Sequence, residues 1–365
     1  MSELNEEDLR NYLKLHYEPP INIQDIEPLG GMEEVDFLLK DYGYGTPLEV
    51  NFTTKGEPKT IVLNTVKPGP FGHQTMPDRA EILFRQYQTF NKLPRHVKAL
   101  DVGAFTKTGP IITLCDVEEL FLITEHVKGR EYFHDLDRIK AEGDAVGLDF
   151  DRAITLAKYL SEIHSEKHED PKYYERRTRE LLGHNECIMG LTDSYPRDHD
   201  WITVDFLAGI EKKTIDWRWH LKTLTHRLST VHGDFHPFNI LFREGTDFTA
   251  LDRSRGELGE PADDVAGLTI NYLFWGLLKD REFRGPFKGL WETFYETYLE
   301  KTGDEEILSV IPPYLTWRAI IVASPVWYPH YSMDIRKKLL NFADNILYES
   351  ALDPNEVDFL LEEKQ

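Results

Sequence analysis

The sequence predicts an α+β fold of two lobes, in which a small β-rich N-terminal lobe precedes a larger, mostly helical C-terminal lobe. Residues 48–53 and 60–66 are two β-rich runs around the turn-like segment 55–58, which predicts a hairpin. Residues 151–164 carry one apolar stripe at helical spacing. β signals therefore come first in the chain and helical signals later.

The first lobe is expected to be completed by a helix and two further β-like stretches. Thr75 to Asp78 is a capping-box-like start with a proline in the first turn, and apolar residues follow it at helical spacing. Residues 97–105 and 120–125 have β character. We expect a small sheet with one helix packed against it.

The second lobe shows further helical patterns, at residues 206–228 and 265–278 and from Trp317 onward. Residues 125–129, where β character ends, are the expected hinge. The lobes are therefore predicted to span residues 1–125 and 126–365.

Composition excludes several classes of protein. The 365 residues are 41% hydrophobic, enough for a sizeable core, and 64 acidic residues against 42 Lys and Arg give a net charge of −22. A binder of duplex nucleic acid that works by neutralising phosphates is therefore not expected, whereas cationic small molecules remain compatible partners.

Localisation is predicted from the cysteines and the apolar runs. Cys115 and Cys187 are too few for a disulfide framework, which favours a reducing, cytoplasmic setting. The first residues lack the basic and apolar regions of a signal peptide, and the apolar runs are shorter than the roughly 20 residues that span a bilayer. We expect no membrane partner.

The most informative segment is 231–242, which reads V-H-G-D-F-H-P-F-N-I-L-F. A short strand follows Asn239, and a turn and a return strand then bring Asp252 back beside it. Phosphoryl transfer from a nucleoside triphosphate needs a carboxylate to hold the acceptor hydroxyl and hard oxygen ligands to hold magnesium. Asp234 is placed for the first task, and Asn239 with Asp252 for the second.

This segment resembles the catalytic loop of the aminoglycoside phosphotransferase and choline kinase-like family, whose members are distant relatives of protein kinases. The family pattern H-G-D-x-x-x-x-N is present from His232 to Asn239, and Asp252 follows thirteen residues later as the start of an Asp-x-x-Arg variant that ends at Arg255. Residues 259–266, G-E-P-A-D-D-V-A, resemble the segment that follows in the family, G-D-P-A-x-D-L-A. The resemblance implies a bilobal protein-kinase-like fold that uses ATP or GTP with Mg²⁺.

The resemblance also implies roles for the residues around the loop. His232 is expected to be a structural loop residue, because the first histidine of the motif has that role in the family. No His or Cys set with zinc spacing accompanies it, so zinc binding is not expected. His236 is expected to line the acceptor side. Arg255 has two interpretations, a phosphate contact or a brace for the loop, and Asp264 is expected to be structural.

In this family a turn in the first lobe covers the nucleotide phosphates with backbone N–H groups. The best match is Gly43-Tyr-Gly45-Thr46, before the strand that starts at Leu48, and Gly30-Gly31 is a weaker alternative. Because glycines are ordinary turn residues, a plain turn is an equally good interpretation.

The family also pairs a Lys or Arg on the third strand with a Glu on the following helix to clamp the phosphates. Glu81 matches the helix position. The alternative interpretation is that Glu81 is an ordinary solvent-exposed helix residue. Asn64 aligns with the expected cation, which departs from the family pattern. Lys67, three residues further, reaches the phosphates only if a bulge shifts the strand, so a surface lysine is the favoured interpretation. The nucleotide contact at the hinge falls on backbone groups from Glu125 to Val127.

The helical lobe offers acidic and aromatic side chains to an acceptor that faces the base. Such groups suit an amine through ion pairing and cation–π contact, although an aromatic residue at helical spacing is more often part of the core. The candidates are Asp263, Trp275, Trp291, Trp317, Trp327 and Tyr328. Aminoglycosides, amino alcohols and sugars are the implied small-molecule hydroxyl acceptors.

The leading hypothesis is a small-molecule kinase that transfers the γ-phosphate of ATP or GTP to a hydroxyl. The departure at Asn64 supports an alternative, a kinase-fold regulatory protein that binds nucleotide or another ligand without efficient transfer. Phosphorylation of protein side chains is a weaker hypothesis, because no A-P-E-like segment follows Asp252.

Overall fold

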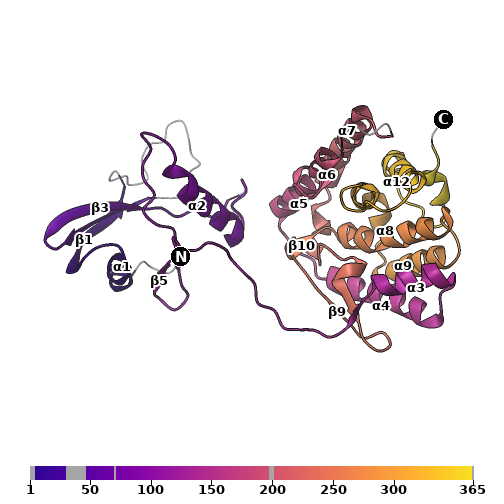
Figure 1. The fold of residues 1–365 in the computed structure, drawn as a ribbon, viewed down its shortest axis with the longest axis horizontal. Helices are drawn as coiled ribbons and strands as arrows, with labels where there is room; N and C mark the ends of the chain where they lie inside the picture. Colours follow the sequence, from indigo (N-terminus) through magenta and orange to yellow (C-terminus); the bar gives the residue numbers. More distant parts are fainter. Residues whose placement is uncertain (1–4, 30–46, 70, 197–200, 364–365) are drawn as a thin grey trace. The chain divides into compact units, whose positions relative to one another are not determined.

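The computed structural model describes residues 5–29, 47–69, 71–196 and 201–363, and the chain divides into two compact units, Met1–Thr124 and Glu125–Gln365. The first unit contains a β-sheet and the second is mainly helical, so the predicted α+β class is confirmed (Figure 1). The residues proposed for the phosphate-covering turn lie outside the described residues: Gly43, Gly45 and Thr46, and the alternative Gly30 and Gly31.

The first unit is built on an antiparallel sheet in the order β1-β2-β3, formed by β1 (Ile21–Pro28), β2 (Leu48–Thr54) and β3 (Glu57–Leu63). Lys55 and Gly56 join β2 to β3 with φ angles of 50° and 84°, the left-handed values that a two-residue hairpin turn requires. The predicted hairpin is confirmed. However, β3 ends at Leu63 rather than at residue 66, because Leu63 already pairs with the first residue of β2.

One face of this sheet is covered by α1 (Glu6–Leu13), which the sequence patterns did not predict. Leu9 and Leu13 of α1 pack with Val50 and Phe52 of β2, and all four side chains are buried. The first unit therefore has a small core of its own.

The predicted helix of the first unit is present as α2 (Met76–Phe90). Its N-cap is a capping box: the Asp78 backbone N–H donates to Thr75 Oγ1, and the Thr75 backbone N–H donates to the Asp78 carboxylate. This confirms the start that the sequence predicts.

The later β predictions of the first unit are largely wrong. Only β4 (Gly103–Phe105) forms within residues 97–105, and it pairs with β5 (Ile111–Thr113). Residues 120–125 have no regular structure, and the side chains of residues 120–123 are exposed. These residues have high β-propensity, but a strand also needs a neighbour for its hydrogen bonds, and propensity does not supply one.

The second unit begins with β6 (Arg130–Glu131) and continues with five helices in succession: α3 (Phe133–Glu142), α4 (Gly147–His164), α5 (Pro171–Gly183), α6 (Ile188–Ser194) and α7 (Val204–Leu221). Short elements then carry the loop of interest: η1 (Thr225–Arg227), β7 (Ser229–Thr230), η2 (Pro237–Asn239), β8 (Ile240–Phe242), β9 (Phe248–Ala250) and β10 (Leu258–Gly259). The remaining elements are α8 (Pro261–Asp280), α9 (Pro286–Thr302), α10 (Ile307–Val310), α11 (Pro312–Ala323), α12 (Met333–Asn345), η3 (Ile346–Tyr348) and η4 (Asp358–Leu361).

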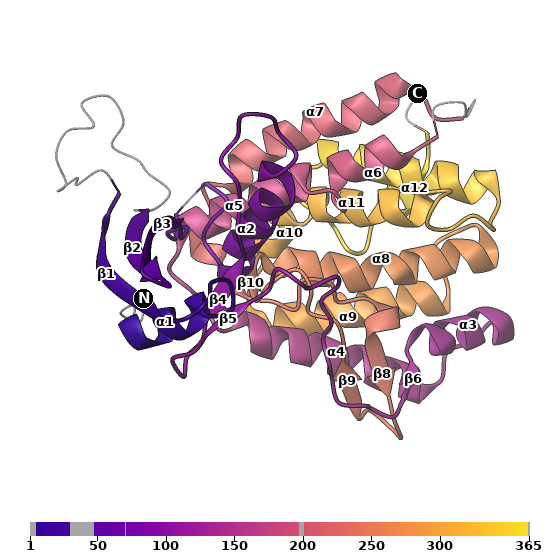
Figure 2. The same cartoon turned by 60° about the vertical axis from the view of Figure 1, so that its left-hand side comes forward.

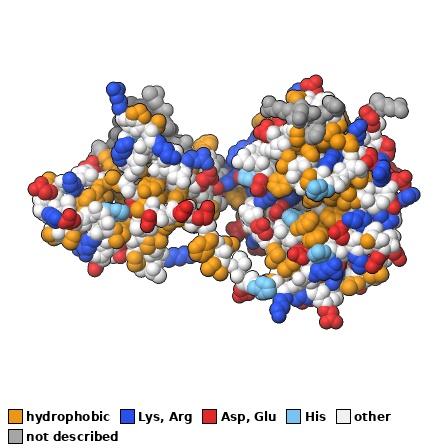
Figure 3. All heavy atoms as spheres, viewed as in Figure 1, with side chains coloured by type: hydrophobic (Ala, Val, Ile, Leu, Met, Phe, Trp, Pro, Cys, Tyr) orange, Lys and Arg blue, Asp and Glu red, His pale blue; other side chains and the backbone are white. Residues whose placement is uncertain are grey.

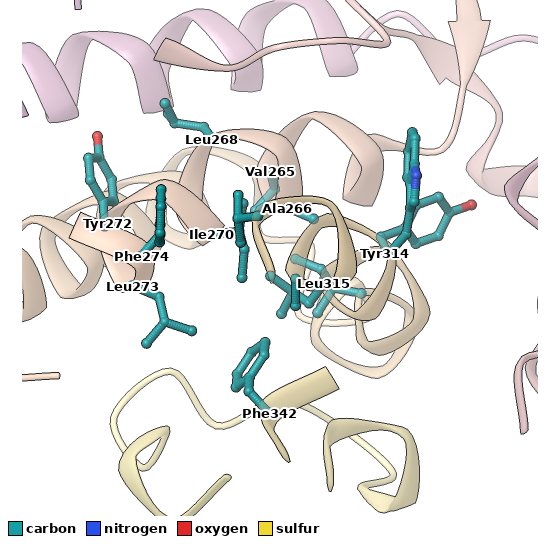
Figure 4. Packing of buried hydrophobic residues seen from close by; sticks show 14 of the residues in the cluster. Val265, Ala266, Leu268, Ile270, Tyr272, Leu273, Phe274, Tyr314, Leu315 and Phe342 are labelled. Carbon is teal, nitrogen blue, oxygen red and sulfur yellow. The ribbon is translucent and has the colours of Figure 1, made fainter. Parts of the chain in front are cut away.

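The core of the second unit surrounds α8. Every residue of α8 from Pro261 to Leu277 is buried, so this helix is covered on all sides. Figure 4 shows side chains of α8 among those of neighbouring helices, including Leu315 and Phe342. Because α8 is immobilised along its length, its first turn is a rigid support for groups that bind to it.

The helical predictions for the second unit hold with adjusted boundaries. Residues 151–164 lie in α4 and residues 265–278 lie in α8. The predicted helix at 206–228 ends at Leu221, where α7 gives way to η1 and then β7. The pattern from Trp317 onward divides between α11 and α12.

The part of the surface that Figure 3 shows carries charges of both signs. Acidic and basic side chains are interspersed on the visible face of both units (Figure 3). Within the described part of the chain, no helix combines the length and the apolar composition that a membrane crossing requires.

Candidate active site

The loop 231–239 is anchored to the first turn of α8. The backbone N–H groups of His232 and Gly233 each donate to the Asp264 carboxylate at 2.7 Å, and Nε2 of His164 lies 3.1 Å from the same carboxylate. Asp264 is fully buried. A carboxylate in this position also interacts favourably with the helix N-terminus, so the anchor holds the loop backbone in one conformation.

Gly233 allows the chain to turn sharply before Asp234. Its φ is +85°, in the region that favours glycine, and an added Cβ would lie 3.3 Å from Cβ of Arg255. The turn directs the Asp234 side chain toward α11.

Asp234 is surrounded by three cationic or ionisable side chains. Nη1 of Arg318 donates to Oδ1 at 2.9 Å, Nη2 of Arg255 lies 3.7 Å from Oδ1, and Nε2 of His236 lies 3.5 Å from Oδ2. Burial alone would raise the pKa of this carboxyl, but the contact with His236 and the charges of Arg318 and Arg255 outweigh burial and hold the pKa well below its usual range. Asp234 is therefore ionised at neutral pH.

Asn239 and Asp252 are brought together by the hairpin that the sequence predicts. The sheet order is β6-β8-β9, in which Ile240 pairs with Ala250 (Figure 2). Beyond this pair the Leu251 backbone N–H donates to the Asn239 carbonyl at 2.8 Å, and Asp252 follows directly. The predicted strand at 240–242 is confirmed, and the return strand predicted at 248–251 is present as β9, which ends at Ala250.

The backbone around Asp252 is held by Arg253. Nε and Nη2 of Arg253 donate to the Val231 carbonyl at 2.9 and 2.7 Å. Asp252 itself has a φ of +53° and is exposed. These hydrogen bonds connect the turn after β9 to the segment before His232. Asp234, Asn239 and Asp252 therefore belong to one connected loop system.

The donor set of Asn239 and Asp252 fits a divalent cation. Nδ2 of Asn239 donates to the Asp234 carbonyl at 3.1 Å, which leaves the amide oxygen available as a ligand. Both side chains present hard oxygen atoms, the type that Mg²⁺ prefers. Among the described residues no group of three or more His, Cys, Asp or Glu side chains is arranged to hold a metal ion, and a cation held by Asn239 and Asp252 would take its other ligands from water or phosphate oxygens.

The two histidines of the motif support the loop. Nδ1 of His232 accepts the Asp234 backbone N–H at 3.3 Å, and the ring packs on Phe235 with centroids 5.4 Å apart. Burial lowers the pKa of His232, so the ring is neutral at neutral pH. Nδ1 of His236 accepts the Phe238 backbone N–H at 3.3 Å, which leaves Nε2 toward Asp234.

A cavity of about 360 Å³ lies beside Asp234, within the second unit. His236, Arg255 and Arg318 line it near the carboxylate, and Trp327 and Tyr328 line another part of its wall. A cavity of this size matches a small organic molecule.

The expected aromatic acceptor site is only partly correct. Trp327 and Tyr328 line the cavity, whereas Trp275, Trp291 and Trp317 belong to the core. The buried tryptophans donate their indole N–H groups to Asp137, Pro354 and Glu186 at 3.0, 3.0 and 2.9 Å. Asp263 is also buried, and it pairs with Arg318 rather than facing the cavity.

Arg318 is the residue of this site that sequence reasoning missed. It is 5% exposed, donates from Nη2 to Asp263 at 2.7 Å, and places its guanidinium 3.9 Å from the centre of the Trp317 ring. The sequence contains a signal for this residue, because Arg318 is the only charged residue of α11. A charge on an otherwise apolar helix requires a buried partner.

The residues considered for the phosphate clamp lie after β3 and on α2 in the first unit. Asn64 and Lys67 lie beyond the end of β3, so the expectation that strand alternation decides their directions is wrong. Glu81 is exposed, and among the described residues its ion-pair partner is Arg85, one turn along the same helix. Glu125 and Val127 lie in the irregular segment before β6.

Comparison with known proteins adds a family relationship. The sequence pattern of the phosphotransferase enzyme family matches residues 84–300, which is more than half of the chain. No curated protein matches.

Several solved structures resemble the chain at low identity. An amicoumacin kinase in complex with AMP-PNP, Ca²⁺ and Ami is 14% identical, with 94% of this chain and 93% of that chain covered and a TM-score of 0.41. A glucosamine kinase in complex with glucosamine, ADP and inorganic phosphate is 15% identical, with coverages of 64% and 61% and a TM-score of 0.39. The choline kinase LicA from Streptococcus pneumoniae is 13% identical, with coverages of 94% and 98% and a TM-score of 0.35.

Proposed function

The chain belongs to the phosphotransferase enzyme family, and from this premise we propose that it transfers the γ-phosphate of ATP or GTP to a hydroxyl group of a small molecule. As a member of this family the chain is a phosphotransferase. The observation that carries the proposal is the loop system that holds Asp234, Asn239 and Asp252 together.

In the proposed reaction, the oxygen of the acceptor hydroxyl forms a bond to the γ-phosphorus. The bond between that phosphorus and the β–γ bridging oxygen breaks, and the nucleoside diphosphate leaves with the electron pair. The hydroxyl proton passes to the Asp234 carboxylate and then to solvent. Atoms and charges are balanced without a covalent enzyme intermediate.

The contacts of Asp234 assign it mainly to positioning. Arg318 donates to Oδ1 at 2.9 Å, whereas Oδ2 has the longer contact of 3.5 Å with Nε2 of His236, so Oδ2 is the oxygen assigned to the acceptor hydroxyl. A carboxylate with a lowered pKa is a weak base, but a loose transition state needs little proton abstraction before the new bond forms. The rate then depends on holding the acceptor oxygen in line with the phosphorus.

Asn239 and Asp252 are proposed to hold Mg²⁺ against the nucleotide phosphates. The ion would supply charge neutralisation on the transferred group when it is bound. Nδ2 of Asn239, by its hydrogen bond to the Asp234 carbonyl, keeps the metal ligand at a constant position relative to the acceptor-holding residue.

Two further nucleotide contacts are proposed, one by backbone groups and one by a lysine of the first unit. Backbone groups from Glu125 to Val127 contact the nucleotide at the hinge. Lys67 remains a candidate for a phosphate contact, because β3 ends before it and no longer dictates its direction. Glu81 is a poorer candidate, since Arg85 already pairs with it.

The proposal is tested by nucleotide consumption with purified protein and a panel of hydroxylated compounds. Asp234→Ala should lower turnover by about 10³-fold or more, because the acceptor loses its anchor. Asp247→Ala is a matched control: this exposed carboxylate lies on the turn between β8 and β9 and pairs with Arg243. Unchanged turnover in Asp234→Ala would exclude the assigned role.

A second measurement separates transfer from binding alone. Mg-ATP should raise the thermal stability of the wild-type protein, since a ligand that binds only the folded state stabilises it. Stabilisation without turnover for any alcohol would favour the regulatory binding protein over the enzyme.

A further inference from the structure

The carboxylates that face the cavity beside Asp234 already have cationic partners. Oδ1 of Asp234 accepts from Arg318 at 2.9 Å, and the Glu186 carboxylate lies 3.5 Å from Nη2 of Arg255. These two are the acidic residues in the cavity wall within the described residues. Neither is left as an unpaired negative charge for a ligand.

Arg318 is held in place from behind. Asp263, which does not line the cavity, accepts from its Nη2 at 2.7 Å, and Trp317 covers its guanidinium. Arg318 is 5% exposed, so the cation is fixed beside the base rather than free to swing into solvent. A second guanidinium, that of Arg255, lies 4.7 Å from the centre of the same Trp317 ring.

This arrangement opposes a positively charged acceptor. An ammonium group that enters a partly buried cavity loses hydration, and an unpaired carboxylate would compensate for that loss most strongly. Here the charges of Asp234 and Glu186 are already balanced by the guanidinium groups of Arg318 and Arg255, so an ammonium group beside the reacting hydroxyl gains no net attraction and lies close to two cations. Like charges at such separations repel strongly where little water remains between them.

The rest of the cavity wall suits an uncharged molecule. Four aliphatic side chains line it: Leu191, Ile270, Ile321 and Val322. Gly267 adds a surface without a side chain, and Trp327 and Tyr328 add aromatic surface. Binding is favoured when an apolar part of the ligand packs against aliphatic side chains and both lose contact with water. Aromatic rings pack on alkyl groups and sugar rings as well as on cations.

We propose that the acceptor is an uncharged alcohol, with its hydroxyl at Asp234 and its body against the aliphatic wall, and that Arg318 excludes cationic alcohols. This inference rests on the proposed phosphotransfer and specifies its substrate class. The chemical step is the transfer already described, with no additional reactant.

The test compares acceptors that differ in charge but not in shape. Choline and 3,3-dimethyl-1-butanol form one pair, because a tert-butyl group replaces the trimethylammonium group; glucosamine and glucose form a second. For each pair kcat/KM is measured with Mg-ATP. We expect the uncharged member of at least one pair to be preferred by about tenfold or more.

Variants then ask whether Arg318 causes the preference. Arg318→Met should shift the ratio of kcat/KM values toward the cationic member by about tenfold, whereas Arg318→Lys, which keeps the charge, should retain the wild-type ratio. Arg152→Met is the matched control, because Arg152 is also a buried arginine, 9% exposed, that pairs with an aspartate, Asp135. Its ratio should equal that of the wild type. If Arg318→Met does not fold, the wild-type ratio and Arg318→Lys decide the question.

The outcomes separate this inference from the function on which it rests. Preference for the cationic member, or turnover only with other cationic compounds of the panel, would overturn the acceptor class and leave the phosphotransferase assignment intact. An unchanged ratio in folded Arg318→Met would overturn the role of Arg318. Absence of turnover with every alcohol, although Mg-ATP stabilises the protein, would count against phosphotransfer itself.

Discussion

Replacing Asp264 with asparagine should destabilise the second unit and release the loop that carries Asp234. The Asp264 carboxylate accepts the backbone N–H groups of His232 and Gly233 at 2.7 Å and contacts His164 at 3.1 Å, all in a fully buried position. Asparagine keeps one acceptor oxygen but turns an NH₂ group toward a backbone N–H. One strong hydrogen bond is lost, and a buried donor is left without an acceptor.

The magnitude follows from these contacts. A hydrogen bond to a charged group contributes about 1.5–3 kcal/mol, and a buried unsatisfied donor costs about 1–3 kcal/mol. We therefore expect the free energy of unfolding to fall by about 3–5 kcal/mol in Asp264→Asn. The neighbouring Asp263→Asn should cost only about 1 kcal/mol, because an amide oxygen still accepts from Arg318.

Tryptophan fluorescence during urea unfolding measures this difference. All 7 tryptophans lie between residues 201 and 327, so the signal comes from the second unit alone. Turnover measured at a temperature well below the unfolding transition shows whether the released loop also costs activity. If Asp264→Asn were no less stable than Asp263→Asn, the anchoring of the loop by Asp264 would be refuted.

Two further predictions concern the metal and pH. Asp252→Asn should raise the Mg²⁺ concentration for half-maximal turnover by about tenfold, because a neutral ligand replaces a carboxylate. A magnesium titration at fixed ATP measures this concentration, and an unchanged midpoint contradicts the prediction. Burial lowers the pKa of His232, so its neutral form stabilises the fold above the unfolded-state pKa of about 6.5, and that contribution decreases as pH falls. Between pH 7.5 and 5 the loss is at most about 1.4 kcal/mol per pH unit, and His232→Asn should show a smaller slope than the wild type in unfolding measurements; equal slopes would argue against it.

Local features of the fold could be predicted because their causes are local. The turn at Lys55 and Gly56, the capping box of Thr75 and Asp78, and the hairpin after Asn239 each depend on residues a few positions apart. Such signals survive in any tertiary context that does not actively oppose them. The wrong strand at residues 120–125 shows the limit, because pairing needs a second strand that composition does not specify.

The candidate site likewise has features that depend on local sequence and features that depend on tertiary packing. The order of Asp234, Asn239 and Asp252 along one loop and hairpin is a property of the sequence, and it was sufficient to predict phosphoryl-transfer chemistry. The direction of each tryptophan was not predictable, because helical spacing alone does not tell a core position from a cavity wall. Trp317 proved to be buried and Trp327 to line the cavity.

The sequence by itself determined the segment proposed as catalytic, the α+β class and the phosphotransferase class of the protein. Only the tertiary structure decided what surrounds Asp234. Arg318 lies 84 residues further along the chain and comes to Asp234 through the packing of α11 against α8. The charge balance of the cavity depends on such long-range contacts, because burial strengthens each ion pair and no local pattern encodes which distant helix supplies the partner.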